Sequence, residues 1–275
     1  MPEGDTVHRN ARVLNRELQG RRLARFFVRD RGDVPELAGH TIERIEAHGK
    51  HLLVHIEGGW ILRVHLGMKG RWIRRHVRER APRDITAMLV ADETAYICEN
   101  AFTAELLREE ALRTHPRLGR LGPDLLADPP DIDEAVRRAR VPAHASREIG
   151  DVLMDQRIAA GIGNVYKSEV LFECRVHPRT RMRDLDADTL TEIFRKAAHL
   201  MRLNLLTRRR TAVPLRRRPT PSAQRLWVYM RSGRPCLDCG TTVERFMQGD
   251  MNRSTYFCPR CQSDNKAVGR TTLSE

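Results

Sequence analysis

Four of the six cysteines stand in two closely spaced pairs near the end of the chain. Each pair has two residues between its cysteines, and eighteen residues separate the pairs, which are Cys236 with Cys239 and Cys258 with Cys261. Four thiolates so arranged can surround a Zn²⁺ ion tetrahedrally, at about 2.3 Å each, with no open position for a reactive water. The spacing lies in the zinc-ribbon range. We therefore predict one structural zinc ion, with a redox dithiol as the alternative.

The N-terminus offers a nucleophile. Removal of Met1 leaves Pro2 as the first residue, with a secondary amine whose pKa is about 8. Such an amine is partly unprotonated at neutral pH and can attack C1′ of a sugar to form an iminium intermediate, a Schiff base. The neighbouring Glu3 carboxyl group can move protons to and from the opened sugar. The alternative is an ordinary chain start before a helix.

Lys50 is one of five lysines in a chain with forty-four arginines. It follows Gly49 at the start of a strand-like segment, residues 51–56. An ammonium group can donate a proton at neutral pH, whereas a guanidinium group is almost never deprotonated. Lys50 is therefore a candidate proton donor, and a solvated strand end is the alternative.

A glycine-rich turn, Ala160-Gly161-Ile162-Gly163-Asn164, separates two segments with helical patterns. Glycines let backbone N–H groups converge, and a helix that begins at Asn164 adds the positive end of its dipole. The turn is thus a candidate anion site that includes Gly163 and Asn164. A helix–turn–helix corner without a ligand is the alternative.

The charge balance points to a polyanionic partner. Lys plus Arg number 49 against 36 for Asp plus Glu, a net charge of +13 with a pI near 10.2. Nucleic acid is the first candidate and an anionic membrane surface the second. The hydrophobic share of 40% supports a packed core and argues against wholesale disorder. No apolar run approaches eighteen residues and the start lacks a signal peptide, so we expect a cytoplasmic, nucleoid-associated protein without membrane contact.

Hydrophobic periodicity predicts the elements that must position these groups. Apolar residues at helical spacing predict a helix over residues 5–18. Short strand-like segments, separated by Gly, Pro and Asp clusters, then predict an antiparallel sandwich or barrel; they cover residues 23–29, 41–47, 51–56, 60–64 and 86–90.

The pattern becomes helical after a Pro- and Gly-rich linker at residues 115–130. Helices are predicted over residues 132–140, 147–155, 164–174 and 188–206. Clustered arginines and prolines predict a mobile loop at residues 207–223. Between the cysteine pairs, strand-like residues 241–246 and 254–257 predict a β-hairpin with its tip at 247–253.

Together these motifs resemble the formamidopyrimidine-DNA glycosylase and endonuclease VIII family of base-excision enzymes. The resemblance extends from about residue 2 to residue 262. Its motifs stand in the family's order, and they are Met1-Pro2-Glu3-Gly4, Gly49-Lys50-His51-Leu52-Leu53, His65-Leu66-Gly67-Met68, Asp155-Gln156-Arg157, Gly161-Ile162-Gly163-Asn164-Val165-Tyr166, and Arg253 ahead of the second cysteine pair.

The resemblance implies a multidomain α+β fold with DNA in a cleft between two lobes. The expected parts are an N-terminal antiparallel β-sandwich with an N-terminal helix (residues 1–114), a helix–two-turns–helix DNA-binding domain (115–224), a zinc-finger β-hairpin (225–265) and a tail (266–275). The implied activity is that of a DNA glycosylase with lyase activity at abasic sites. The expected partner is damaged double-stranded DNA, with single-stranded or bubble DNA left open, and the expected state is a monomer.

The resemblance also implies roles for particular residues. Pro2 would form the Schiff base, Glu3 would act as general acid and base, and Lys50 would donate a proton near the lesion. Arg253 would hold the phosphate beside the flipped nucleotide and assist the second elimination. DNA contacts are expected from Met68, which fills the gap left by the base, and from Arg83, Gly163, Asn164 and Tyr166. Such enzymes must extrude the base, because its glycosidic carbon is inaccessible within a duplex.

Two departures from the family's pattern bear on the substrate. The formamidopyrimidine branch has an Arg-Phe wedge where this chain reads Glu99-Asn100-Ala101-Phe102, so the arginine is absent. Gly4 is typical of the endonuclease VIII branch, whereas Met68 is closer to the other branch. We therefore expect oxidised pyrimidines as substrates. The alternatives are a glycosylase that prefers 8-oxoguanine or formamidopyrimidines, and a non-catalytic zinc protein that binds damaged DNA.

Overall fold

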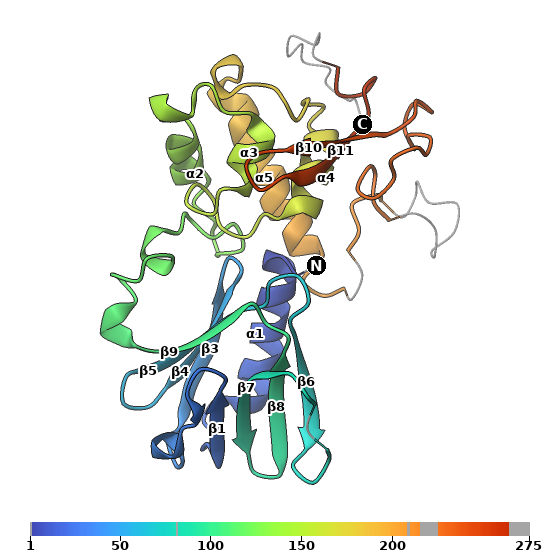
Figure 1. The fold of residues 1–275 in the computed structure, drawn as a ribbon. Helices are drawn as coiled ribbons and strands as arrows, with labels where there is room; N and C mark the ends of the chain where they lie inside the picture. Colours follow the sequence, from blue (N-terminus) through green and yellow to red (C-terminus); the bar gives the residue numbers. More distant parts are fainter. Residues whose placement is uncertain (1, 81, 208–209, 215–224, 264–275) are drawn as a thin grey trace. The chain divides into compact units, whose positions relative to one another are not determined.

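The computed structural model of the protein describes residues 2–80, 82–207, 210–214 and 225–263. Residues 208–209 and 215–223 of the predicted loop, and the predicted tail at 266–275, lie outside these ranges. The chain divides into two compact units, Met1–Asp128 and Pro129–Glu275. Figure 1 shows strands concentrated in the first unit and helices in the second.

The first unit combines one helix with two antiparallel sheets. The helix is α1 (Gly4–Leu18). One sheet has the strand order β2-β1-β7-β8-β6, formed by β1 (Arg25–Val28), β2 (Gly32–Asp33), β6 (Arg71–His76), β7 (Ile85–Ala91) and β8 (Thr94–Glu99). The other has the order β3-β4-β5-β9, formed by β3 (Ile42–His48), β4 (His51–Ile56), β5 (Trp60–His65) and β9 (Thr103–Arg108).

The two sheets share one hydrophobic core with α1, which packs against β3 and β4. The helix contributes its apolar stripe of Val7, Ala11, Leu14 and Leu18. Alternation along β4 sends Leu52, Val54 and Ile56 into this core and leaves the two histidines of the strand for the other face of the sheet. The helix that follows Pro2 is therefore fixed by the same core that fixes the strand after Lys50.

The second unit contains four α-helices and a hairpin among its described residues. They are α2 (Ile132–Ala139), α3 (Ile149–Met154), α4 (Asn164–Glu173) and α5 (Ala187–Leu203), with β10 (Glu244–Gln248) antiparallel to β11 (Arg253–Phe257). Asp131 and Asp186 cap α2 and α5 through hydrogen bonds from Glu134 N at 2.9 Å and Thr189 N at 2.7 Å.

Helix α4 lies at the centre of this unit. Residues 164–172 of the helix are all buried, and α3, α5 and β11 pack around it. Glu169 of this helix is fully buried. Its carboxylate accepts backbone N–H groups from Trp227, Val228 and Tyr229 at 2.7–3.0 Å, which makes its burial possible. A single helix thus holds both the hairpin and the segment that leads to it.

The structure confirms the predicted α+β class: an antiparallel sandwich, a helical region, and a C-terminal hairpin that carries the cysteine pairs. It also adds strands β2, β6, β8 and β9, which the sequence patterns did not indicate. Short 3-10 helices occupy Pro35–Leu37, Glu109–Ala111, Leu118–Arg120, Pro142–His144 and Met182–Asp184. Among the described residues, every helix is too short or too polar to span a lipid bilayer.

Candidate functional site

Pro2 and Glu3 lie immediately before helix α1. Pro2 is half-buried, and Glu3 is completely buried although its side chain is polar. Glu3 occupies the N-cap position, where its backbone carbonyl accepts N–H groups from Thr6 and Val7 at 3.0 and 3.1 Å. Its carboxylate makes no capping hydrogen bond to the helix. The buried Glu3 side chain therefore directly follows Pro2 in the chain and is not the cap of α1.

Lys50 is half-buried in the turn between β3 and β4. Its ammonium charge acts on His65, at the end of the neighbouring strand β5. Burial first, then the charges of Arg63, Lys50 and Arg117, lower the pKa of His65 to about 4. His65 is therefore a neutral imidazole at physiological pH, in an electropositive part of the unit.

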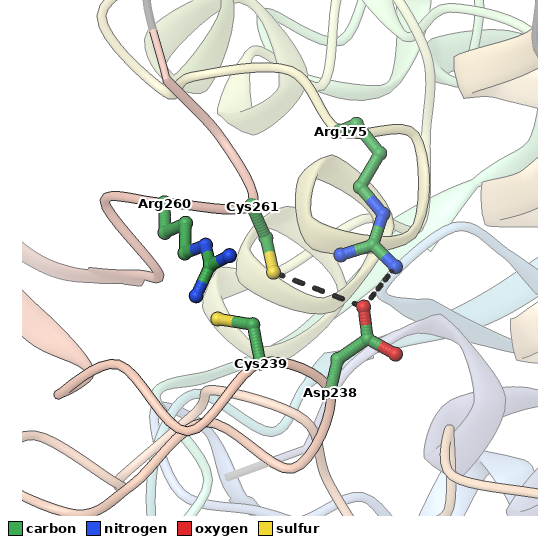
Figure 2. Close-up of a pocket in the computed structure, with 5 residues that line it drawn as sticks. All are labelled: Arg175, Asp238, Cys239, Arg260 and Cys261. Carbon is green, nitrogen blue, oxygen red and sulfur yellow. Dashed lines mark hydrogen bonds and ion pairs between the residues drawn. The ribbon is translucent and has the colours of Figure 1, made fainter.

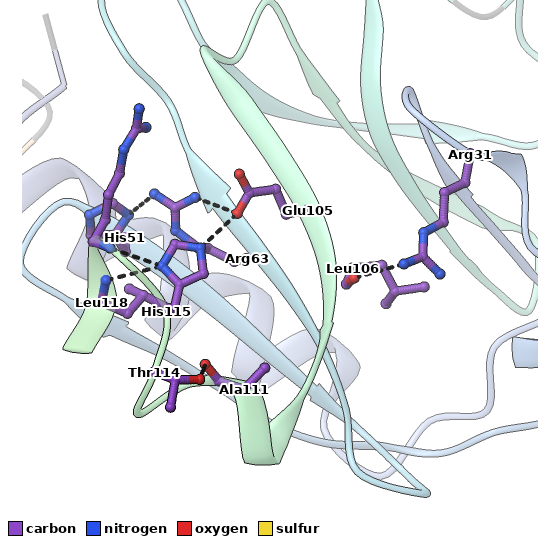
Figure 3. A network of polar contacts seen from close by, with 10 residues as sticks. Arg31, His51, Arg63, Glu105, Leu106, Ala111, Thr114, His115 and Leu118 are labelled. Atoms are coloured by element: carbon purple, nitrogen blue, oxygen red, sulfur yellow. Dashed lines mark hydrogen bonds and ion pairs between the residues drawn. The ribbon is translucent and has the colours of Figure 1, made fainter.

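A polar network lies on the face of the β3-β4-β5-β9 sheet that points away from the shared core (Figure 3). Arg63 is 0% exposed and donates hydrogen bonds to Glu105 at 2.7 Å and to His51 Nδ1 at 3.1 Å. Glu105 also lies 3.1 Å from Nε2 of His115. Burial, followed by the charge of Arg63, lowers the pKa of His51 to about 2, consistent with Nδ1 acting as an acceptor. The network ties the segment after β9 to the sheet that carries Lys50.

Two exposed apolar side chains, Met68 and Phe102, stand on neighbouring turns of the first unit. They are 64% and 67% exposed. A Cβ added to Gly67 would lie 2.7 Å from Phe102 Cβ, so the turn after β5 and the turn before β9 touch closely. The Arg117 guanidinium carbon lies 6.0 Å from the Phe102 ring centre. Arg83, by contrast, is exposed in the segment before β7.

In the second unit, Gln156 braces the glycine-rich turn. Its side-chain amide donates to the backbone carbonyls of Met154 and Ile162 at 2.9 and 3.0 Å, and its oxygen accepts from Gly161 N at 3.1 Å. Gly163 is the N-cap of α4. The turn therefore has a fixed shape at the positive end of a helix, which suits an anion.

Asn164 joins this turn to the hairpin. Its side-chain N–H donates to the Ser254 carbonyl at 2.7 Å, and Ser254 adjoins Arg253 at the start of β11. The side-chain oxygen of Asn164 is buried and has no hydrogen-bond partner among the described residues. Arg253 itself is half-buried and pairs in register with Gln248. The structure thus places the start of α4 against the strand that begins at Arg253, and the phosphate grip stays a prediction.

Tyr166 differs from the other predicted contact residues because it is only 2% exposed. Its ring lies 5.4 Å from the guanidinium carbon of Arg210. The side chain therefore belongs to the packing beneath the turn, and its predicted contact with DNA stays a prediction.

The four cysteines form one cluster. Their sulfur atoms all lie within 4.8 Å of one another, with 3.9 Å between Cys236 and Cys261 and 3.5 Å between Cys239 and Cys258. Sulfurs placed tetrahedrally at about 2.3 Å from zinc would stand about 3.8 Å apart, so the cluster has the size that a metal ion needs.

A pocket of about 530 Å³ lies beside the cysteine cluster (Figure 2). Arg175, Asp238, Arg260 and two of the cysteines line it. Asp238 accepts a hydrogen bond from Arg175 at 2.6 Å and lies 3.8 Å from Cys261 Sγ. This ion pair connects the end of α4 to the first cysteine pair.

Sequence reasoning missed the buried network of His51, Arg63, Glu105 and His115. A signal was present, because His51, Arg63 and His65 interrupt strands that are otherwise rich in Leu, Val and Ile. Polar residues at alternate positions of buried strands indicate a shared polar face. The other missed residue, Gln156, lies within a quoted motif but had no role assigned to it.

Comparison with protein families gives two matches to this chain. Residues 1–103 match the model described as the formamidopyrimidine-DNA glycosylase N-terminal domain. Residues 121–212 match the model described as the formamidopyrimidine-DNA glycosylase H2TH domain.

Two similar relatives cover almost the whole chain. A probable endonuclease 8 2 of Streptomyces coelicolor is 40% identical over 271 residues, which are 96% of this chain and 94% of the relative. A DNA-(apurinic or apyrimidinic site) lyase Nei2 of Mycolicibacterium smegmatis is 34% identical over 96% of this chain and 99% of its own.

Among solved structures, the fold is similar to the formamidopyrimidine DNA glycosylase of Lactococcus lactis, bound non-covalently to DNA that contains an AP site. The TM-score is 0.80 at 21% identity, over 96% of this chain and 100% of that one. The similarity extends over both compact units of the chain.

We expect acid to destabilise the first unit through His51 and His65. Their folded-state pKa values of about 2 and about 4 lie below the ordinary 6.5, so the unfolded chain binds more protons between pH 4 and 6.5. The free energy of unfolding should therefore be highest above about pH 6.5 and fall as the pH drops, by at most about 1.4 kcal/mol per pH unit for each histidine.

Urea unfolding between pH 4.5 and 8 measures this slope. His51→Asn, which cannot gain the proton, should show a shallower dependence on pH than the wild type. An equal slope in the two proteins would mean that His51 is not held neutral by its surroundings.

Proposed function

Because the chain belongs to the formamidopyrimidine-DNA glycosylase and endonuclease VIII family, we propose that it excises oxidised bases from DNA with Pro2 as the nucleophile. Membership of this family makes the chain a DNA glycosylase with lyase activity in base excision repair. The observation that carries the assignment of the nucleophile is the burial of Glu3 directly after Pro2, at the start of a helix packed on the strand that follows Lys50.

The proposed reaction begins with the attack of the Pro2 nitrogen on C1′ of the damaged nucleotide. The C1′–base bond breaks, the base leaves with a proton, and ring opening of the sugar gives an iminium. Glu3 takes the proton that the Pro2 nitrogen loses after its attack and delivers it to the ring oxygen, and Lys50 supplies the proton that leaves with the base. A secondary amine suits this step, because a partly unprotonated nitrogen is available at neutral pH.

Strand cleavage then follows from the acidity of the sugar next to the iminium. Loss of a C2′ proton breaks the C3′–O bond, which is β-elimination. A further proton loss breaks the C5′–O bond, which is δ-elimination. Hydrolysis of the iminium frees Pro2 and leaves a one-nucleotide gap with phosphate ends. During these steps, Arg253 holds the phosphate that leaves in the second elimination.

The proposed grip on DNA combines specific and diffuse contacts. Gly163, Asn164 and Arg253 offer a helix N-terminus, an amide and a guanidinium group in one place, a donor set that fits a phosphate. Met68 would fill the space left by the extruded base, and Arg83 would contact the backbone. The net charge of +13 adds affinity that depends on salt but not on sequence.

We infer that residues 1–114 carry out catalysis, that residues 115–224 bind DNA, and that residues 225–265 form a zinc finger. The substrate is damaged double-stranded DNA of the nucleoid, bound by a monomer. In the zinc finger, Cys236, Cys239, Cys258 and Cys261 would hold one Zn²⁺ ion. With all four positions taken by thiolates, the ion would fix the hairpin that carries Arg253 and perform no step of the reaction.

Oxidised pyrimidines are the proposed lesions. The relatives named endonuclease 8 and the Asn100-Ala101-Phe102 turn without its arginine both favour this choice over 8-oxoguanine. Phe102 is exposed beside Met68, so an apolar wedge is present although the arginine of the other branch is missing.

Borohydride trapping tests the proposed function. Reduction of the iminium should link the wild-type protein covalently to a duplex that contains thymine glycol or an abasic site. An N-terminal extension that blocks the Pro2 amine should lower the yield of adduct at least about 100-fold, because no nitrogen remains to attack C1′. The blocked protein should still bind the duplex, which serves as the control for folding.

Tight binding by the wild type without an adduct on any lesion would support the non-catalytic alternative instead. The same assay ranks the lesions, since we expect thymine glycol to be excised faster than 8-oxoguanine. The reverse order would place the protein with the formamidopyrimidine branch.

Zinc removal tests the proposed role of the cysteine cluster. A chelator should reduce strand cleavage by more than about 10-fold and weaken DNA binding, because the hairpin that carries Arg253 loses its metal support. Added Zn²⁺ should restore both. Cys236→Ser should reproduce the loss, whereas Cys174→Ser, outside the cluster, should leave activity and zinc content unchanged. Normal cleavage by zinc-free protein would contradict the positioning role of the finger.

A further inference from the structure

We infer that Asp124 is a positioning residue that holds the helix after Pro2 in place relative to the turn at Lys50. This inference rests on the proposed function, because it concerns the relative placement of the proposed nucleophile and proton donor. Asp124 lies in none of the motifs that indicated function. It belongs to the segment Leu121-Gly122-Pro123-Asp124 that comes after the sandwich strands.

Both oxygens of the Asp124 carboxylate are engaged. Oδ2 lies 2.7 Å from Nε2 of His8 and accepts the backbone N–H of Gly49 at 2.8 Å. Oδ1 accepts the backbone N–H of Leu126 at 2.9 Å. The residue is only 7% exposed. Because an ionised carboxylate only accepts, the His8 ring must be the donor in this contact.

The ionised form of Asp124 is the form that these contacts favour. Burial opposes ionisation, but the hydrogen bond and charge of His8, followed by the backbone N–H groups of Gly49 and Leu126, outweigh it and hold the pKa below its usual value. A charged acceptor that receives three donors in a buried place is a strong local restraint.

The two partners of Oδ2 belong to the two elements that carry the proposed chemistry. His8 lies on α1, which begins at Gly4 directly after Pro2 and Glu3. Gly49 immediately precedes Lys50, and its φ of +56° marks the tight turn between β3 and β4. A single oxygen atom therefore links the helix to the turn.

A second contact joins the same segment to the turn. Nε2 of His48 lies 3.1 Å from the carbonyl oxygen of Gly122. Residues 122–124 thus contact two successive residues, His48 and Gly49, so the backbone before Lys50 has little freedom to shift. Misplacement of a reacting group by about 1 Å can cost on the order of 100-fold in rate, so loss of this restraint should affect chemistry before it affects the fold.

The test is single-turnover borohydride trapping of the Asp124→Asn variant on abasic-site DNA. The amide keeps one acceptor oxygen, but its NH₂ group cannot accept a hydrogen bond. The donors that contact one of the two carboxylate oxygens therefore lose their acceptor. We expect adduct formation at saturating protein to slow at least about 30-fold, while the Kd for the duplex changes less than about twofold. Asp124→Glu, which restores both acceptors, should recover part of the rate.

Two control variants separate positioning from stability. Asp33→Asn removes an exposed carboxylate of the same unit that pairs with Arg25 at 2.7 Å, and it should trap at the wild-type rate. Leu37→Ala removes a fully buried side chain of the core; it should lower the melting temperature at least as far as Asp124→Asn and still trap normally at 25 °C.

A double variant tests the route through His8. If Asp124 acts by holding α1, His8→Ala combined with Asp124→Asn should be no slower than Asp124→Asn alone. Wild-type trapping together with an unchanged rate in Asp124→Asn would overturn the inference and leave the proposed function standing. Absence of an adduct with the wild type would overturn both.

Discussion

The placement of Pro2, the proposed nucleophile, depends on the residues that follow it, which are the buried Glu3 and a helix whose apolar stripe enters the core of the sandwich. Helix α1 packs on β3 and β4, and the turn between these strands carries Lys50. The hydrophobic effect thus sets the coarse placement of the two groups, and polar contacts such as those of Asp124 refine it.

In the second unit, helix α4 positions the hairpin. Helix α4 is buried on all sides for most of its length and has polar residues among its buried positions. Lys167 donates to Thr255 at 2.6 Å, Asn164 donates to the Ser254 carbonyl, and Glu169 accepts three backbone N–H groups. Because a buried polar group costs stability unless it is paired, these contacts define one position of the hairpin strand relative to the helix. The second cysteine pair begins directly after this strand, at Cys258.

The sequence allowed much of this to be predicted, and the exceptions have physical causes. The helix after Pro2, strand β4 and the cysteine cluster followed from periodicity and spacing. Strand β6 was missed because Arg71–His76 is an exposed edge strand with few apolar residues, and β9 because its Ala-Glu-Leu-Leu sequence favours a helix. Two of the three partners of Asp124 lie 75 and 116 residues away in the chain, so only the folded structure reveals them. The domain boundaries and the roles of the site residues stay predictions.

In the proposed reaction, the nitrogen of Pro2 becomes bonded to the sugar of the damaged nucleotide. Proteolysis of the borohydride-reduced adduct, followed by tandem mass spectrometry, identifies the modified residue directly. We predict that the sugar remnant is carried by the N-terminal peptide, on the Pro2 nitrogen, with Met1 absent. A remnant on Lys50 or on any other side chain would contradict the assignment of Pro2 as the nucleophile.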